Sequence, residues 1–189
     1  MSNTTPPRRG TGNLHRGRVS VPGARYFVTV CALRPSDALI RPETAQAIQR
    51  SLESVCAGGD GSLLCATIMP DHVHLLLKLG ERLGIGQVAG KFKSLNRGDL
   101  AIAGAAWQRD FFEHRLRPNE SADSYARYIF MNPYRGGLIE RRAQWPWWWL
   151  GENTEFDFIA MLDDGLYPPP EWTDGDLGAL GLRAKDVGE

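Results

Sequence analysis

Two apolar runs separated by Pro70-Asp71 constrain the fold of this 189-residue chain more than any other feature. Residues 62–69 and 72–79 are rich in apolar and β-branched side chains, which predicts two strands joined by a turn or a bend. Residues 25–33 predict another strand for the same reason. These strands do not alternate regularly with helices, as strands of a parallel sheet would, so we expect an antiparallel sheet.

Apolar residues recur at helical spacing in three further segments: residues 42–55, 85–95 and 121–131. Ser121 is a favourable N-cap for the last of these helices, and Pro133 is expected to end it. Residues 107–116 mix apolar and basic side chains and predict one more strand. The predicted fold class is therefore α+β, with helices packed on a small antiparallel sheet.

The charges divide the chain into a basic body and an acidic end. Residues 1–150 hold 20 Lys and Arg against 12 Asp and Glu, a net +8, whereas residues 151–189 hold 2 against 10, a net −8. A basic body suits a phosphate backbone, although a solvated surface with a solubilising acidic tail would look the same. We predict a basic N-terminal arm (1–24), one folded domain (25–150) and a weakly ordered acidic tail (151–189).

Composition also argues against several classes of protein. Residues 1–23 contain no apolar run that could act as a secretory signal or a membrane span, so we expect an intracellular, cytoplasmic protein. The cysteines Cys31, Cys56 and Cys65 are odd in number and lack C-x-x-C spacing. This pattern argues against a disulfide framework and a zinc knuckle, and we interpret the three residues as small buried apolar side chains.

Two pairs of polar residues are candidates for chemistry. His72 and His74 alternate along a predicted strand, so both imidazoles project from one face and could bind a divalent metal. Two histidines on a solvated face would show the same spacing. Tyr128 and Asn132 lie four residues apart and therefore on one face of a helix. Taken alone, Tyr128 could equally be a structural residue whose ring is buried and whose hydroxyl reaches water. Asn132 could equally be a residue that ends a helix.

The order of several short motifs resembles that of the REP-associated tyrosine transposases, a bacterial branch of the single-tyrosine HUH transposases. The central motifs are Met69-Pro70-Asp71-His72-Val73-His74-Leu75-Leu76, Trp107 to His114, Tyr128-Ile129-Phe130-Met131-Asn132-Pro133 and Gly137-Leu138. The flanking ones are Arg16-Gly17-Arg18, Gly23 to Phe27 and Trp145-Pro146-Trp147. The resemblance covers roughly residues 14 to 150.

This resemblance implies a fold, an activity and a site. The fold would be the HUH endonuclease fold, a ferredoxin-like antiparallel sheet flanked by helices. The activity would be metal-dependent cleavage and rejoining of single-stranded DNA through a 5′-phosphotyrosine intermediate. His72 and His74 would bind Mg²⁺ or Mn²⁺, and Tyr128 would be the nucleophile. Asn132 would be a further ligand or a positioning group, although related transposases often have Gln there.

The implied partners are single-stranded DNA hairpins from repetitive palindromic elements, bound by a monomer in preference to a dimer. Neither a membrane nor a small organic cofactor is expected. Arg16 and Arg18 would read a guide sequence beside the hairpin, and His114 would support the site or touch DNA, unless it is a buried, hydrogen-bonded histidine. Candidates for phosphate contacts are Lys91, Lys93, Arg109, Arg115 and Arg117. For Lys91 and Lys93, a solvated helix face is the alternative.

Two other functions fit the same residues. A DNA-binding protein of repeat palindromes that does not cleave would bind DNA regardless of metal and of the Tyr128 hydroxyl. A small metal-dependent hydrolase would use His72 and His74 with a water nucleophile, and it would form no covalent adduct with DNA.

Overall fold

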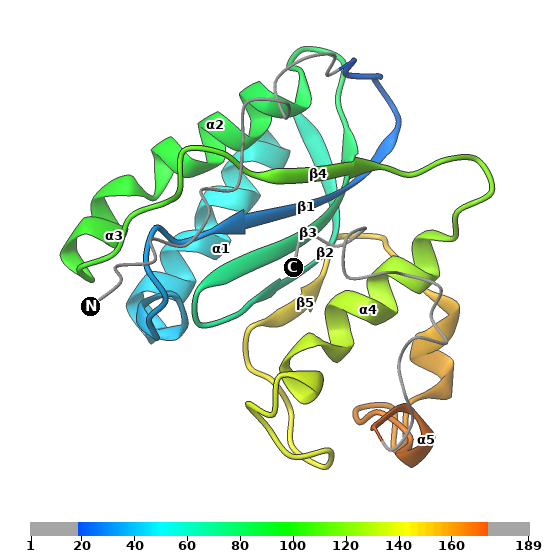
Figure 1. The fold of residues 1–189 in the computed structure, drawn as a ribbon. Helices are drawn as coiled ribbons and strands as arrows, with labels where there is room; N and C mark the ends of the chain where they lie inside the picture. The colour runs from blue at the N-terminus through cyan, green and yellow to red at the C-terminus, as the bar shows by residue number, and fades with distance from the viewer. Residues whose placement is uncertain (1–18, 174–189) are drawn as a thin grey trace, which may run out of the picture.

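A five-stranded antiparallel sheet in the order β4-β1-β3-β2-β5 forms the centre of the molecule (Figure 1). The computed structural model describes residues 19–173. The strands are β1 (Arg25–Cys31), β2 (Gly61–Ile68), β3 (His72–Leu79), β4 (Phe112–Arg115) and β5 (Trp148–Leu150). The α-helices are α1 (Pro42–Ala57), α2 (Ile85–Leu95), α3 (Arg97–Ile102), α4 (Ala122–Arg135) and α5 (Pro170–Thr173). Short 3-10 helices span Ala38–Ile40 and Asp157–Met161.

The chain order from β1 to β4 defines the topology. The succession β1-α1-β2-β3-α2-α3-β4, with β1 and β3 in the middle of the sheet, is the ferredoxin-like arrangement. The α+β class and the ferredoxin-like expectation are both confirmed. β5 adds a fifth strand beside β2, and its register pairs Cys65 with Leu150 and Thr67 with Trp148.

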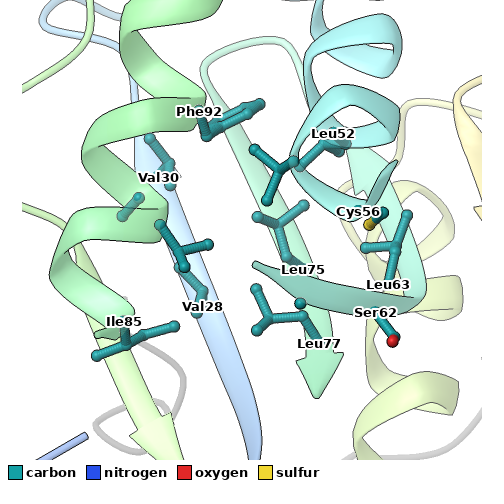
Figure 2. A pocket seen from close by; sticks show the side chains of 14 residues that line it. Val28, Val30, Leu52, Cys56, Ser62, Leu63, Leu75, Leu77, Ile85 and Phe92 are labelled. Carbon is teal, nitrogen blue, oxygen red and sulfur yellow. The ribbon is translucent and has the colours of Figure 1, made fainter. Parts of the chain in front are cut away.

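The two faces of the sheet are covered by different helices. The first face packs under α1, α2 and α3, where Leu52 of α1 and Phe92 of α2 meet Val28 of β1 and Leu75 of β3 around a small apolar cavity (Figure 2). The second face packs under α4, because alternate residues of each strand point to opposite sides. His72 and His74 belong to the α4 face, so the cavity lies on the other side of the sheet from them.

Helix α4 continues past the proline that was expected to end it. Pro133 lies inside the helix, and a pair of glycines ends it instead. Gly137 adopts φ +65°, Gly137 N–H donates to the Tyr134 carbonyl at 3.1 Å, and Leu138 N–H donates to the Pro133 carbonyl at 2.9 Å. This is a Schellman cap. The prediction was therefore wrong about the end of the helix, because the favourable glycine cap and the buried apolar face outweigh the hydrogen bond lost at the proline.

Two other predictions need correction. In residues 107–116, only Phe112–Arg115 forms a strand, and Trp107 makes a single bridge to Ala32. The weakly ordered tail predicted from residue 151 does not hold for residues 151–173, since Phe158 and Trp172 are buried in the core beneath α4. Among residues 19–173, no helix has the length and apolarity needed to span a bilayer.

Candidate active site

One row of side chains crosses the α4 face of the sheet from edge to edge. Register pairs Phe112 with Thr29, Thr29 with His74, His74 with Thr67, and Thr67 with Trp148. His74 stands in the middle of this row on the central strand β3, and only 2% of it is exposed. The two threonines flank it at equivalent positions on β1 and β2. His74 is therefore packed between side chains of the two neighbouring strands.

The two predicted metal ligands face one another. The Nε2 atoms of His72 and His74 are 3.0 Å apart. His72 Nδ1 lies 2.8 Å from the Asp71 carboxylate, and since a carboxylate only accepts, this nitrogen donates its proton to Asp71. His74 Nδ1 lies 2.9 Å from Thr29 Oγ1, in a buried contact. Both rings are thus fixed through Nδ1, which leaves both Nε2 atoms directed into the same space.

This donor set fits a divalent cation. Two nitrogen ligands at right angles, each about 2.1 Å from an ion, are about 3 Å apart, which is the separation of the two Nε2 atoms. Burial, followed by repulsion from His72, holds the pKa of His74 well below its usual range, so the ring is neutral at pH 7 and has a lone pair to offer. The hydrogen bond from His72 lowers the pKa of Asp71. A carboxylate behind a ligating imidazole is a common feature of metal sites.

Helix α4 brings the predicted nucleophile to the histidines. The Tyr128 ring meets the His74 ring edge-on with 5.7 Å between centroids, and it meets Phe27 in the same manner at 5.9 Å. The Tyr128 side chain is 2% exposed. The structure therefore places Tyr128 on the same face as the imidazoles, as the proposed chemistry requires.

Asn132 joins the same site from the next turn of α4. Its Nδ2 donates to the Tyr128 carbonyl at 3.2 Å, and its side chain is within hydrogen-bonding reach of His74. Within residues 19–173, no cluster of three His, Cys, Asp or Glu side chains could hold a metal ion. The amide oxygen of Asn132 is therefore the candidate for a third protein ligand beside the two histidines.

Arg135 is a site residue that the sequence interpretation missed. Its guanidinium carbon lies 5.1 Å from the centre of the Tyr128 ring, and its charge contributes to the lowered pKa of His74. Tyr128, Asn132 and Arg135 are spaced at i, i+4 and i+7, which is one face of a helix. That spacing was visible in the sequence, but expecting the helix to end at Pro133 left Arg135 outside it.

The predicted DNA-contact residues fall into two groups. Arg109, Arg115 and Arg117 are exposed, as a phosphate contact requires. Lys91 and Lys93 have partners within the protein: Lys91 Nζ lies 2.5 Å from the buried Asp60 carboxylate, and Lys93 Nζ donates to the carbonyls of residues 108–110 at 2.9–3.2 Å. Arg16 and Arg18 lie outside the described residues. The role of all these residues in DNA binding stays a prediction.

His114 lies on β4, near the start of α4. Its Nε2 is 2.8 Å from Glu120 Oε2, and its ring stacks on Tyr125 with 5.7 Å between centroids. Glu120 also accepts the Arg117 N–H at 2.6 Å. These contacts connect β4 to the loop that leads into α4. They match the alternative of a buried, hydrogen-bonded histidine in part, since His114 is hydrogen-bonded but only half-buried, while contact with DNA stays a prediction.

Comparisons with known proteins agree with this geometry. The family model described as "Transposase IS200 like" matches residues 25–132, more than half of the chain. The chain therefore belongs to the IS200-like transposase family. The matched region runs from the start of β1 to Asn132, and so includes both histidines and Tyr128.

Two relatives and one solved structure are similar to this chain, and all three are named as REP-associated tyrosine transposases. A REP-associated tyrosine transposase of Escherichia coli K12 is 23% identical over 153 residues, which cover 80% of this chain and 86% of that protein. A Haemophilus influenzae protein assigned to the same group is 25% identical over 140 residues, covering 66% of this chain and 78% of that protein. The structure of a REP-associated tyrosine transposase bound to a REP hairpin matches with a TM-score of 0.58 and 22% identity, covering 74% of this chain and 93% of that one.

These comparisons confirm the resemblance predicted from the motifs. The likeness to the solved structure supports the fold, and the family match with the two relatives identifies the chain as a transposase.

The prediction that the three cysteines are buried is confirmed in part, since Cys65 is buried while Cys31 and Cys56 are half-buried. Burial raises the pKa of each of the three thiols.

Proposed function

We propose that this transposase cleaves and rejoins single-stranded DNA with Tyr128 as the nucleophile and a divalent cation held by His72, His74 and Asn132. The observation that carries the proposal is the meeting of the Tyr128 ring with the imidazole pair on the α4 face of the sheet. Tyr128 lies on α4 and the two histidines lie on β3, and these two elements are distant in sequence. A purely hydrophobic contact between them would not require two Nε2 atoms that face the same space.

The residues fit Mn²⁺ or Mg²⁺, and imidazole ligands favour the transition metal. When bound, such a cation would neutralise charge on a phosphodiester and orient its phosphorus for attack. Asp71 and Thr29 would keep both Nε2 lone pairs available by accepting the protons of the two Nδ1 atoms. Because His74 is neutral at pH 7, it would not have to lose a proton before binding metal.

The reaction exchanges one phosphate ester for another. Tyr128 Oη forms a bond to phosphorus as the bond between phosphorus and the 3′ oxygen breaks. The phenolic proton passes to solvent and the leaving 3′ oxygen gains one, which gives a 5′-phosphotyrosine and a free 3′-hydroxyl. A 3′-hydroxyl from another strand can reverse these bond changes without ATP, because the tyrosyl ester retains the energy of the broken bond. The outcome is strand transfer.

Tyr128 is buried, so its hydroxyl must become accessible before it can attack DNA. With only 2% of the side chain exposed, its hydroxyl cannot reach a phosphorus atom until it is uncovered. We infer that DNA binding shifts the Tyr128 side chain or α4. The edge-on contacts of this ring with Phe27 and His74 are the ones that such a shift would change.

DNA hairpins from palindromic repeats are the proposed partner. The two relatives are named for their association with REP elements, and the structural neighbour was solved with a REP hairpin. The net +8 of residues 1–150 suits a phosphate backbone, and a genomic substrate would put the protein at the nucleoid. Binding as a monomer, with Arg16 and Arg18 reading the guide sequence, is part of the same proposal.

A covalent-capture assay tests the proposed function. Full-length protein is incubated with Mn²⁺ and a labelled pool of single-stranded hairpin oligonucleotides with randomised 5′ flanks, and adducts are separated on a denaturing gel. Wild type should form an adduct, and Tyr128→Phe should form none. Tyr125→Phe is the matched control, since Tyr125 is equally buried on α4 and should leave the adduct unchanged.

The outcomes separate the three candidate functions. An adduct that persists in Tyr128→Phe would refute the nucleophile assignment. Binding of the hairpins without any adduct, with or without metal, would indicate a protein that binds DNA but does not cleave it. Metal-dependent cleavage without any adduct would indicate a hydrolase.

A further inference from the structure

Arg135 carries an exposed positive charge beside the nucleophile. Its guanidinium lies over the Tyr128 ring at 5.1 Å, one turn beyond Asn132 on the same face of α4. Within residues 19–173, Arg135 forms no hydrogen bond and no ion pair besides its contact with the Tyr128 ring, so the donors of its planar group are available. The side chain is exposed, whereas Tyr128, His74 and Asn132 are all buried.

Other arginines near α4 are engaged differently. Arg141 donates to Asp163 at 2.8 Å and to the Pro168 carbonyl at 3.0 Å, which holds the segment after β5 in place. Arg127 lies over the Trp172 ring at 5.1 Å, on the part of α4 that faces the C-terminal segment. Of the two arginines of α4, Arg127 therefore packs on the C-terminal segment, whereas Arg135 lies beside Tyr128.

We propose that Arg135 binds the phosphate that Tyr128 attacks. The proposal rests on the proposed function and adds a phosphate-binding residue to it. An attacked phosphodiester must lie near the Tyr128 hydroxyl and the imidazole pair, and Arg135 borders that space from the solvent side. A guanidinium can bind two phosphate oxygens with parallel N–H donors, and it stabilises the charge that builds on them during in-line displacement.

A simpler role for Arg135 would be stabilisation of the helix end. Arg135 is in the last turn of α4, where any positive charge interacts favourably with the helix dipole. Lysine would serve that role as well as arginine, but it lacks the planar pair of donors. A phosphate-binding role therefore predicts that Arg135→Lys keeps the thermal stability of wild type and still loses part of the activity.

The first experiment measures single-turnover adduct formation on an oligonucleotide captured by wild type. Arg135→Gln should react about 100-fold more slowly, the usual cost of losing one charged donor at a transition state. Arg135→Lys should be intermediate. Arg142→Gln is the matched control, since Arg142 is exposed and follows the end of α4 by seven residues, and it should react at the wild-type rate. An Arg135→Gln rate equal to that of wild type would overturn the proposal.

The second experiment needs no cleavage. Inorganic phosphate is titrated into the full-length protein in EDTA while NMR follows the arginine Nε–H resonances, with the Arg135 signal identified by its loss in Arg135→Lys. The Arg135 resonance should shift and saturate, and that of Arg142 should not. No shift at Arg135, or an equal shift at Arg142, would overturn the proposal. Saturable phosphate binding at Arg135 without any adduct from wild type would instead contradict the proposed function alone.

Discussion

Replacement of Thr29 by valine removes the hydroxyl that holds His74. Thr29 Oγ1 lies 2.9 Å from His74 Nδ1, and the two residues are 4% and 2% exposed. Water therefore cannot replace the lost partner. Valine has nearly the same volume as threonine but carries a methyl group in place of the hydroxyl, so the change removes the hydrogen-bonding partner of His74.

The expected cost follows from that burial. A buried polar group left without a partner costs about 1–3 kcal/mol, and each kcal/mol lowers the melting temperature of a chain of this size by about 2–4 °C. Thermal unfolding in EDTA should therefore show a melting temperature lower by about 4–8 °C for a loss of about 2 kcal/mol. Mn²⁺ affinity, measured by calorimetry, should fall about 10–100-fold, because His74 can offer Nε2 to a metal only while Nδ1 carries the proton and needs an acceptor.

Thr67→Val supplies the matched control on the other side of His74. Thr67 pairs with His74 in the register of β2 and β3 and is fully buried. In the part of the chain that the structure describes, its hydroxyl has no hydrogen-bond partner. Valine should therefore leave stability at or above the wild-type value and leave Mn²⁺ affinity unchanged. Equal losses in Thr29→Val and Thr67→Val would refute the assignment of Thr29 as the residue that positions His74.

Three further predictions concern the metal ligands, Lys91 and acid stability. His72→Asn should abolish adduct formation and leave hairpin binding in EDTA close to wild type by gel shift; free cutting by this variant would show that the metal site is misassigned. Lys91→Gln should lower the melting temperature, because it leaves the buried Asp60 carboxylate with one partner fewer, and should change hairpin affinity little; the reverse pattern would make Lys91 a phosphate contact. Below its ordinary pKa of 6.5, His74 takes up a proton in the unfolded chain but not in the fold. The free energy of unfolding in EDTA should therefore decrease as pH falls from 6.5, by up to about 1.4 kcal/mol per pH unit, and His74→Asn should flatten this part of the curve if the linkage is correct.

The sequence predicted the sheet and the two histidines because these depend on local rules. Strand periodicity alone puts His72 and His74 on one face, and the β3 register places that face under α4. The same reasoning could not show which ring nitrogens face one another. That depends on Thr29, which is 45 residues away in sequence from His74 and becomes its neighbour only when β1 pairs with β3.

The errors came from local rules that tertiary packing overrode. Proline usually ends a helix, but α4 keeps Pro133 because its apolar face is buried and a glycine cap follows. An acidic composition indicated weak order after residue 150, yet Phe158 and Trp172 find a place in the core beneath α4. The ion pair of Lys91 with Asp60 was also missed, because it joins residues 31 positions apart that no local pattern relates; a contact of Lys91 with DNA stays a prediction.

Mass spectrometry of the trapped adduct tests the central claim most directly. After the captured complex is digested with nuclease and trypsin, cleavage at Arg127 and Arg135 releases a peptide of residues 128–135, which contains Tyr128 and Tyr134. Fragmentation should place a 5′-phosphonucleotide on the Tyr128 oxygen and leave Tyr134 unmodified. A nucleotide on Tyr134, or on any residue outside this peptide, would contradict the account.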